Sequence, residues 1–128
     1  MAKVEKKYLT PLQKQLAKER WWVRSMHGNV YQMGIPDLLM VRPSDGEIIL
    51  LEAKGTRHLE ESYMQVDILG KLKGPQVGNI IILNKMRAKV CLLLGGPSGY
   101  CLVKAPFHPH RIENIITAEE VVQELSSW

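Results

Sequence analysis

The sequence predicts an α/β fold in which one mixed β-sheet is flanked by helices, in the order helix, three strands, helix, two strands, helix. Strand-like and helical segments alternate along the chain, which is typical of this class. Two neighbouring strand-like segments, 37–43 and 47–54, are apolar at consecutive positions, so we expect both of their faces to be covered. The length of 128 residues fits one domain, which we expect to span 1–128.

The helical segments show start signals and apolar spacing. They are 11–20, 75–86 and 117–125. Thr10 and Pro11 form an N-cap and first-turn pair, while residues 3–9 leave open whether the first helix begins earlier. The isoleucines at 80–82 would suit a strand as well as the second helix. The apolar side expected of that helix consists of Val77, Ile80, Ile81, Leu83 and Met86. The sequence of 117–120 is a capping box for the third helix.

The strand-like segments are rich in branched and aromatic residues and are bounded by turn residues. They are 21–26, 37–43, 47–54, 89–94 and 100–105. The turn PSDG at 43–46 predicts a hairpin between the second and third strands, and GGPSG at 95–99 predicts another between the last two. Side chains alternate along a strand, so we expect one of Trp21 and Trp22 in the core and allow the other to be exposed.

Composition and charge restrict the class of protein. The apolar and charged fractions, 45% and 23%, are those of an ordinary soluble protein, and no apolar run is long enough to cross a bilayer. The start MAKVEKKYL lacks the apolar stretch of a signal peptide, so we expect a cytoplasmic protein. Cys91 and Cys101 lie in apolar runs without metal-ligand spacing, which predicts buried thiols rather than a zinc site. The net charge of +4 favours a polyanion as partner without identifying one.

Three charged residues fall within the apolar strands. Asp37 follows Pro36 where a loop becomes a strand, and alternation places Glu52 and Lys54 on one face of the next strand. Pairing about the turn at 43–46 brings Asp37 opposite Glu52, so the three side chains converge. A turn aspartate and an exposed ion pair at a strand end would explain them singly, but their joint position predicts a site.

Two clustered carboxylates repel each other and lose hydration unless a cation lies between them. Oxygen ligands suit Mg²⁺ or Mn²⁺, and the carbonyl of Ala53 could complete the protein's share of the coordination. Such an ion draws in a phosphodiester, lowers the pKa of a bound water and neutralises charge in the transition state. Lys54 can orient or activate the water, or stabilise developing negative charge. Hydrolysis of a nucleic-acid backbone fits this basic protein best.

Pro36-Asp37 followed by Glu52-Ala53-Lys54 resembles the signature of the PD-(D/E)xK nucleases. The longer strings GIPDLL and LEAKG resemble the virus-type replication–repair nuclease branch (VRR-NUC) and small phage and Holliday-junction-resolvase-like relatives. The resemblance covers roughly residues 5 to 104. It implies a restriction-endonuclease-like core of αβββαβ, to which this chain would add a C-terminal hairpin strand and a helix.

The resemblance also implies roles for individual residues. These are metal ligation by Asp37, Glu52 and the carbonyl of Ala53, and catalysis by Asp37, Glu52, Lys54 and Gln76. Gln76 fits a glutamine that such nucleases often carry early in the helix after the lysine strand, and Gln65 is the alternative. Glu5 in the first helix is a candidate for a further metal ligand. This assignment stays open, because Pro11 lies between Glu5 and the rest of the helix.

The sequence thus predicts a Mg²⁺- or Mn²⁺-dependent DNA endonuclease. The residues expected to contact the DNA backbone are Arg24, His27, Arg57, Lys71 and Lys73. We expect a homodimer, because cutting both strands of a duplex or a branched junction takes two sites. Exposed apolar positions in 56–73 or in the C-terminal helix are the candidates for its interface. The resemblance implies a structure-selective role in recombination, repair or phage DNA processing, in a bacterial or phage-infected cell. The alternatives are a non-catalytic DNA-binding or assembly module on the same fold and an RNA-directed nuclease.

Overall fold

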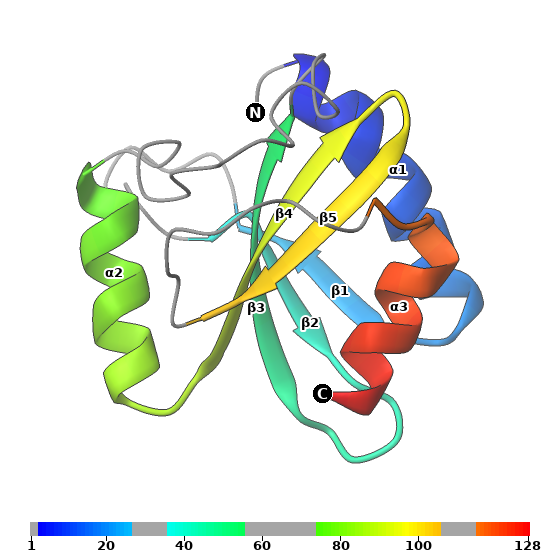
Figure 1. The fold of residues 1–128 in the computed structure, drawn as a ribbon. Helices are drawn as coiled ribbons and strands as arrows, with labels where there is room; N and C mark the ends of the chain where they lie inside the picture. Colours follow the sequence, from blue (N-terminus) through cyan, green and yellow to red (C-terminus); the bar gives the residue numbers. More distant parts are fainter. Residues whose placement is uncertain (1–2, 27–35, 56–73, 106–114) are drawn as a thin grey trace.

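The computed structural model describes residues 3–26, 36–55, 74–105 and 115–128, with the side chains of 3–6 and 74–77 outside this description. In these segments the helices and strands follow the predicted order, so the predicted α/β class is confirmed (Figure 1). The helices are α1 (Lys3–Lys18), α2 (Gly74–Lys85) and α3 (Ala118–Ser127). The strands are β1 (Trp22–Ser25), β2 (Leu38–Val41), β3 (Ile48–Gly55), β4 (Lys89–Gly96) and β5 (Gly99–Lys104).

The strands form one mixed sheet in the order β1-β2-β3-β4-β5, so β3 lies in its middle. Neighbours are antiparallel except for β3 and β4, which run parallel and therefore need the crossover that contains α2. The β2–β3 hairpin turns at 43–46, where Gly46 has a φ of 75° that suits a residue without a side chain. The β4–β5 hairpin turns at Pro97 and Ser98. Both predicted hairpins are confirmed.

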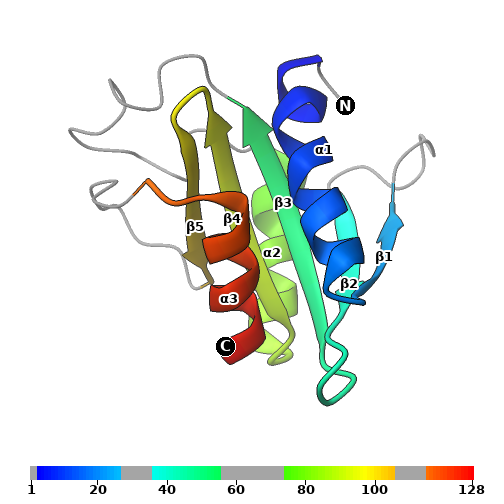
Figure 2. The same cartoon turned by 90° about the vertical axis from the view of Figure 1, so that its right-hand side faces the viewer.

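One face of the sheet is covered by α1 and α3, which lie side by side (Figure 2). Their buried side chains are Leu9, Leu12 and Leu16 from α1 and Val121, Val122 and Leu125 from α3. They pack on alternate residues of β2 and β3, namely Leu38, Met40, Ile49, Leu51 and Ala53. Burial of each large apolar side chain contributes about 1.5–3 kcal/mol. The residues between these in β3, Leu50, Glu52 and Lys54, must therefore face the other side.

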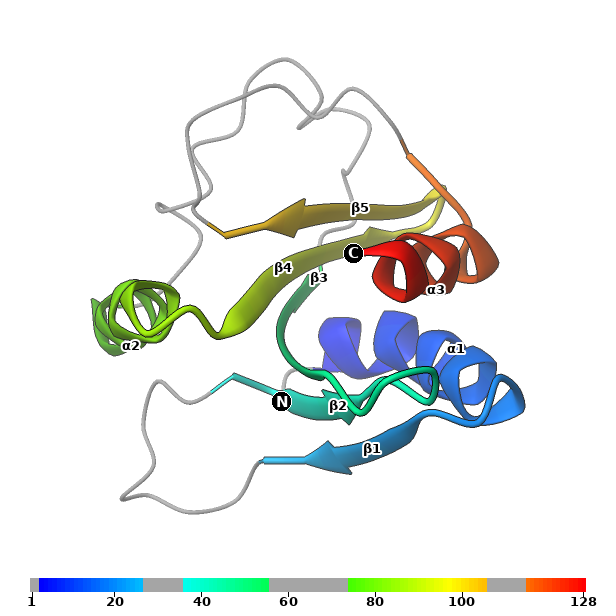
Figure 3. The ribbon, with the colours of Figure 1, turned by 90° about the horizontal axis from the view of Figure 1, so that it is seen from below.

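The opposite face is covered by α2, so the sheet runs between α2 and the pair α1 and α3 (Figure 3). Ile80 of α2 is buried in a second core cluster with residues of β4 and β5. The helical reading of 75–86 is confirmed, but part of its expected apolar side is wrong. Ile81 is 48% exposed and Met86 is 74% exposed, because α2 buries only a narrow stripe around Ile80 and Leu83 against β4.

The first helix takes the earlier start that the sequence left open, because α1 begins at Lys3 and contains Pro11 in its interior. Thr10 is consequently a helical residue and does not serve as the N-cap. An interior proline loses one hydrogen bond and crowds the preceding turn, at a cost of about 3 kcal/mol. Leu9 lies one turn before Leu12 on the same buried stripe, and its burial helps to offset that cost.

Helix α1 ends in a Schellman pattern without glycine. The N–H of Trp21 donates to the carbonyl of Leu16 at 3.0 Å, and that of Arg20 donates to the carbonyl of Ala17 at 3.0 Å. Arg20 itself adopts the left-handed conformation, with φ of 68°. Arg87, with φ of 63°, ends α2 in the same conformation. Arginine thus takes the position that glycine usually occupies.

The hairpin turn after β2 is tied to the end of α3 by Arg42, which is only 6% exposed. Its guanidinium donates to both carboxylate oxygens of Asp45, at 2.9 and 2.8 Å. It also donates to the carbonyl of Leu125, at 3.0 Å, and to that of Trp128. Arg42 and Leu125 are 83 residues apart in the sequence. One charged side chain therefore connects the β2–β3 turn to the end of α3.

Candidate active site

Asp37 lies immediately before β2 and is held in place from two sides. Its residue is 8% exposed, and its backbone carbonyl accepts a hydrogen bond from the N–H of Met26 at 2.9 Å. Its carboxylate oxygen Oδ2 accepts one from the backbone N–H of Ala53 at 2.7 Å. The carboxylate is therefore fixed against β3 at the centre of the Glu52-Ala53-Lys54 segment.

Glu52 and Lys54 lie near the carboxyl end of β3, on the face that α2 covers. Glu52 is 1% exposed, and the side chain of Lys54 is 17% exposed. The Lys54 ammonium lies 3.8 Å from Oε1 of Glu52. Their neighbours in the parallel register are Leu92 and Leu94 of β4, both almost fully buried. A charged pair in such apolar surroundings has lost much of its hydration, which strengthens electrostatic interactions inside the site.

The hairpin register brings Asp37 and Glu52 together. Leu38 pairs with Leu51, so one further step places Asp37 opposite Glu52. The side chains of Leu38 and Leu51 belong to the core under α1 and α3. By alternation, those of Asp37 and Glu52 share the opposite face with Lys54. The structure thus assembles the three charged residues as the sequence pattern predicts.

The chemistry of these donors fits a divalent cation. Two buried carboxylates and a nearby backbone carbonyl are hard oxygen ligands of the kind that Mg²⁺ and Mn²⁺ take, with water and a phosphate completing the coordination. Within the described residues, no group of three or more His, Cys, Asp and Glu side chains is placed to hold a metal. A cage made of side chains alone, as structural zinc requires, is therefore not built from the described part of the chain.

The two cysteines offer no nucleophile. Cys91 and Cys101 are both free and buried, as the sequence predicts. Burial raises the pKa of the Cys101 thiol to about 11 and that of Cys91 still further. Because the thiolate is the reactive form, both side chains stay protonated and inert near neutral pH.

The structure describes the other predicted site residues only in part. Gln76 lies in the first turn of α2, which starts toward the end of the sheet where β3 and β4 end (Figure 1). Glu5 belongs to α1, which covers the opposite face of the sheet from Lys54. The side chains of both lie outside the described residues, and so does the alternative Gln65.

Of the residues expected to contact DNA, Arg24 is described, and it is exposed on β1. The others, His27, Arg57, Lys71 and Lys73, lie outside the described residues. Of the tryptophan pair, Trp21 is buried and Trp22 is 48% exposed. The bond from the Ala53 N–H to Asp37 could not be predicted from the sequence, because every residue except proline carries a backbone amide.

No protein-family model matches the sequence, and no curated protein sequence matches it. Among solved structures, the fold is similar to that of Hjc, a Holliday junction resolvase from the archaeal hyperthermophile Archaeoglobus fulgidus, with a TM-score of 0.58. The two sequences are 12% identical, and the similarity covers 94% of this chain and 98% of that chain. At this level of identity the likeness concerns the fold, over nearly the whole length of both chains.

Proposed function

We propose that this chain is a Mg²⁺- or Mn²⁺-dependent DNA endonuclease of the PD-(D/E)xK type that acts on branched DNA. The observation that carries the proposal is the convergence of Asp37, Glu52 and Lys54 on one face of the central hairpin. The likeness of the fold to a Holliday junction resolvase supports the proposed nuclease activity and the branched substrate. That likeness also favours DNA over RNA as the substrate.

The proposed reaction is hydrolysis of a phosphodiester bond. The oxygen of a water bonds to phosphorus while the bond from phosphorus to one bridging oxygen breaks. The water gives up a proton and the leaving oxygen takes one up, so one strand end carries a phosphate and the other a hydroxyl. A divalent ion held by Asp37, Glu52 and the Ala53 carbonyl would supply charge neutralisation at the phosphate and a more acidic water. Lys54 orients that water or stabilises the developing negative charge.

The buried position of the site supports these roles. Asp37 keeps a fixed orientation through its bond to the Ala53 N–H, which pre-organises one carboxylate for binding. Lys54 lies close enough to Glu52 to be positioned by it and still keeps part of its side chain exposed. Gln76 is proposed as an additional catalytic residue from the placement of its helix turn at this end of the sheet.

A homodimer is part of the proposal, because cleavage of a junction at two strands needs two copies of a single-site chain. The exposed large apolar side chains of the described residues include Ile81, Ile82 and Met86, which are 48%, 56% and 74% exposed. They cluster on the outer side of α2 and the turn after it, a surface that a partner copy would cover. Recombination, repair or phage DNA processing in the cytoplasm is the proposed setting. None of the helices in the described residues is long and apolar enough to span a membrane.

The proposal is tested by cleavage assays on supercoiled, linear, single-stranded and four-way-junction DNA and on RNA, each with Mg²⁺, Mn²⁺ or EDTA. We expect metal-dependent cleavage that favours the junction. Asp37→Asn and Lys54→Met should each lower the rate by about a hundredfold or more, because each removes charge that acts on the reacting phosphate. Titration of Mn²⁺ into the protein gives a second readout, in which Asp37→Asn should lose binding.

Two matched controls remove similar charges elsewhere. Glu47→Gln changes a carboxylate just before β3, at the opposite end of the strand from Lys54, and Lys85→Met changes an exposed lysine at the end of α2. Both should cleave at the wild-type rate, and circular dichroism should show all variants folded. Equal cleavage by Asp37→Asn and the wild type would overturn the proposal. DNA binding without cleavage would favour the non-catalytic module, and cleavage of RNA alone would favour an RNA-directed nuclease.

A further inference from the structure

Trp22 and Arg24 form an exposed stacked pair on β1. Trp22 is 48% exposed although it is a large aromatic residue in a strand. The guanidinium carbon of Arg24 lies 4.3 Å from the centroid of the Trp22 ring, within the range of a cation–π contact. Arg24 also donates to the carbonyl of Val23 at 3.0 Å, which restrains its guanidinium. An indole and a positive charge are thus held together at the surface.

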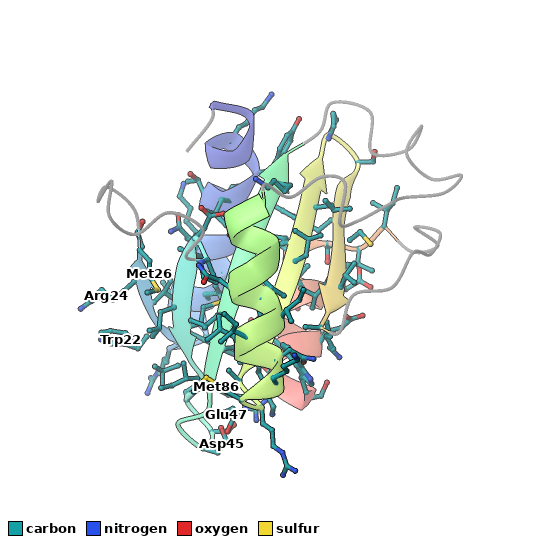
Figure 4. The ribbon with its side chains drawn as sticks, turned by 90° about the vertical axis from the view of Figure 1, so that its left-hand side faces the viewer. Trp22, Arg24, Met26, Asp45, Glu47 and Met86 are labelled. Atoms are coloured by element: carbon teal, nitrogen blue, oxygen red, sulfur yellow. The ribbon has the colours of Figure 1, made fainter. Side chains whose placement is uncertain are left out.

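This pair lies on the same face of the sheet as the candidate active site. Val23 packs against the core under α1 and α3, so alternation turns Trp22 and Arg24 to the opposite face. Figure 4 shows them with Met26 along β1, at the margin of the face that α2 covers. The bond from the Met26 N–H to the Asp37 carbonyl places Met26 beside Asp37.

The spacing along β1 relates the pair to the reacting phosphate. Side chains on one face of a strand repeat about every 7 Å, so Arg24 lies about 7 Å and Trp22 about 13 Å along the strand from Met26 and hence from Asp37. A DNA strand in a duplex advances about 3.4 Å per nucleotide, and further when it is unstacked. Trp22 therefore lies within about four nucleotides of a phosphate bound at Asp37.

The chemistry of the pair matches an unpaired nucleotide. Bases in a duplex are stacked on one another and show only their edges, whereas an unpaired base can lay its flat face on an aromatic side chain. Arg24 supplies the positive charge for a neighbouring phosphate. A second copy of the chain is the rival occupant, since Ile48 on this face is also an exposed apolar residue, but the positive charge of Arg24 beside Trp22 favours DNA.

We propose that Trp22 and Arg24 bind an unpaired nucleotide of the DNA strand that enters the active site. The preferred substrates are then junctions or flaps in which single-stranded DNA adjoins a duplex. This inference rests on the proposed nuclease function for the position of the scissile phosphate. The stacking contact itself requires no cleavage.

The contact is tested in EDTA, by fluorescence anisotropy with a single-stranded oligonucleotide, a blunt duplex of the same sequence and that duplex with a single-stranded flap. Trp22→Leu should weaken binding of the single strand and the flap by roughly 5- to 150-fold, since stacking contributes about 1–3 kcal/mol per base. Binding of the blunt duplex should be unchanged, and Trp22→Phe should keep most of the affinity. Arg24→Gln should reduce the slope of log affinity against log salt by about 1.

Ile48→Ser is the matched control, because Ile48 is another exposed apolar residue on this face, 53% exposed. It should bind all three oligonucleotides like the wild type. Wild-type affinity of Trp22→Leu for the flap, or an equal loss for flap and duplex, would overturn the inference. So would a change of sedimentation in Trp22→Leu without a change in DNA binding, which would assign the pair to a protein contact. A flap-specific loss in a protein that cleaves nothing would uphold the contact and overturn the nuclease function instead.

Discussion

Asp45 shows how one side chain makes the stability of the fold depend on pH. The pKa of its carboxyl is lowered to about 2, first by the hydrogen bond from Arg42 and then by that from the Glu47 N–H. An ordinary aspartate titrates near 3.9. Because the folded protein holds this carboxylate ionised more strongly than the unfolded chain, its contribution is present above about pH 4 and is lost as the pH falls toward 2.

Asp45→Asn should therefore reduce the loss of folding stability that the wild type shows as the pH falls from 4 to about 2. We expect the urea midpoint of the variant to lie below that of the wild type at pH 7, and the difference to shrink as the pH falls from 4 to about 2. Glu124→Gln, which removes an exposed carboxylate of α3, should follow the wild-type curve. A constant difference between Asp45→Asn and the wild type at all pH values would show that the ionised pair does not cause the acid dependence.

Residue-level prediction from the sequence succeeded where strand geometry alone sets the position. Asp37, Glu52 and Lys54 could be placed because alternation and a four-residue turn fix which side chains meet. The link from Arg42 to α3 could not be predicted, since its acceptors there are backbone carbonyls of Leu125 and Trp128. Which backbone carbonyls lie near Arg42 depends on the fold, and no pattern of residue types in the sequence predicts it.

At the scale of single elements, the ends of the helices were harder to predict than their existence. The usual stop signal is a glycine after the last turn, and here Arg20 and Arg87 take the left-handed position instead. The start of α1 stayed open because Pro11 is typical of a first turn, whereas the buried Leu9 belongs to a helix that begins earlier, at Lys3. At the start of α1, burial of Leu9 therefore outweighs the helix-breaking tendency of Pro11.

Arg87→Gly should stabilise the protein by about 1 kcal/mol, because glycine adopts the left-handed conformation without the steric cost that a side chain incurs. The bonds that close this end, from Ala88 to Leu83 and from Arg87 to Asn84, both at 3.0 Å, use backbone atoms and survive the change. Thermal unfolding measures the effect, and Arg87→Ala serves as the control that should show no such gain. Destabilisation by Arg87→Gly would mean that the arginine side chain itself supports the end of α2.

At the scale of the whole molecule, the order of helices and strands could be predicted from the sequence. The surface that would join two copies of the proposed dimer could not. The fold with this order of strands is similar to that of a resolvase, with a TM-score of 0.58. Exposed apolar positions were expected in the segment 56–73 or in the C-terminal helix. The first lies outside the described residues, and the exposed large apolar side chains that are described lie elsewhere than on α3. Which face of an amphipathic element meets solvent depends on neighbours that are distant in sequence.

Ile82→Glu combined with Met86→Glu should convert the proposed dimer to a monomer, because two carboxylates would be buried against a partner copy. Sedimentation at several protein concentrations measures the change. Gln123→Glu, which adds one charge on the exposed side of α3, should leave the association state unchanged. A wild-type protein that sediments as a monomer at all concentrations would exclude the dimer, whatever the variants do.

The parallel pairing of β3 with β4 also sets when during synthesis the site can form. A ribosome delivers Asp37, Glu52 and Lys54 well before the residues of β4 that flank them, among them Leu92 and Leu94. Until that strand has left the ribosome and the chain has closed the crossover, the carboxylate of Glu52 stands in water beside an incomplete sheet. An unfinished chain would thus carry Asp37, Glu52 and Lys54 without the buried surroundings that β4 gives them in the complete fold.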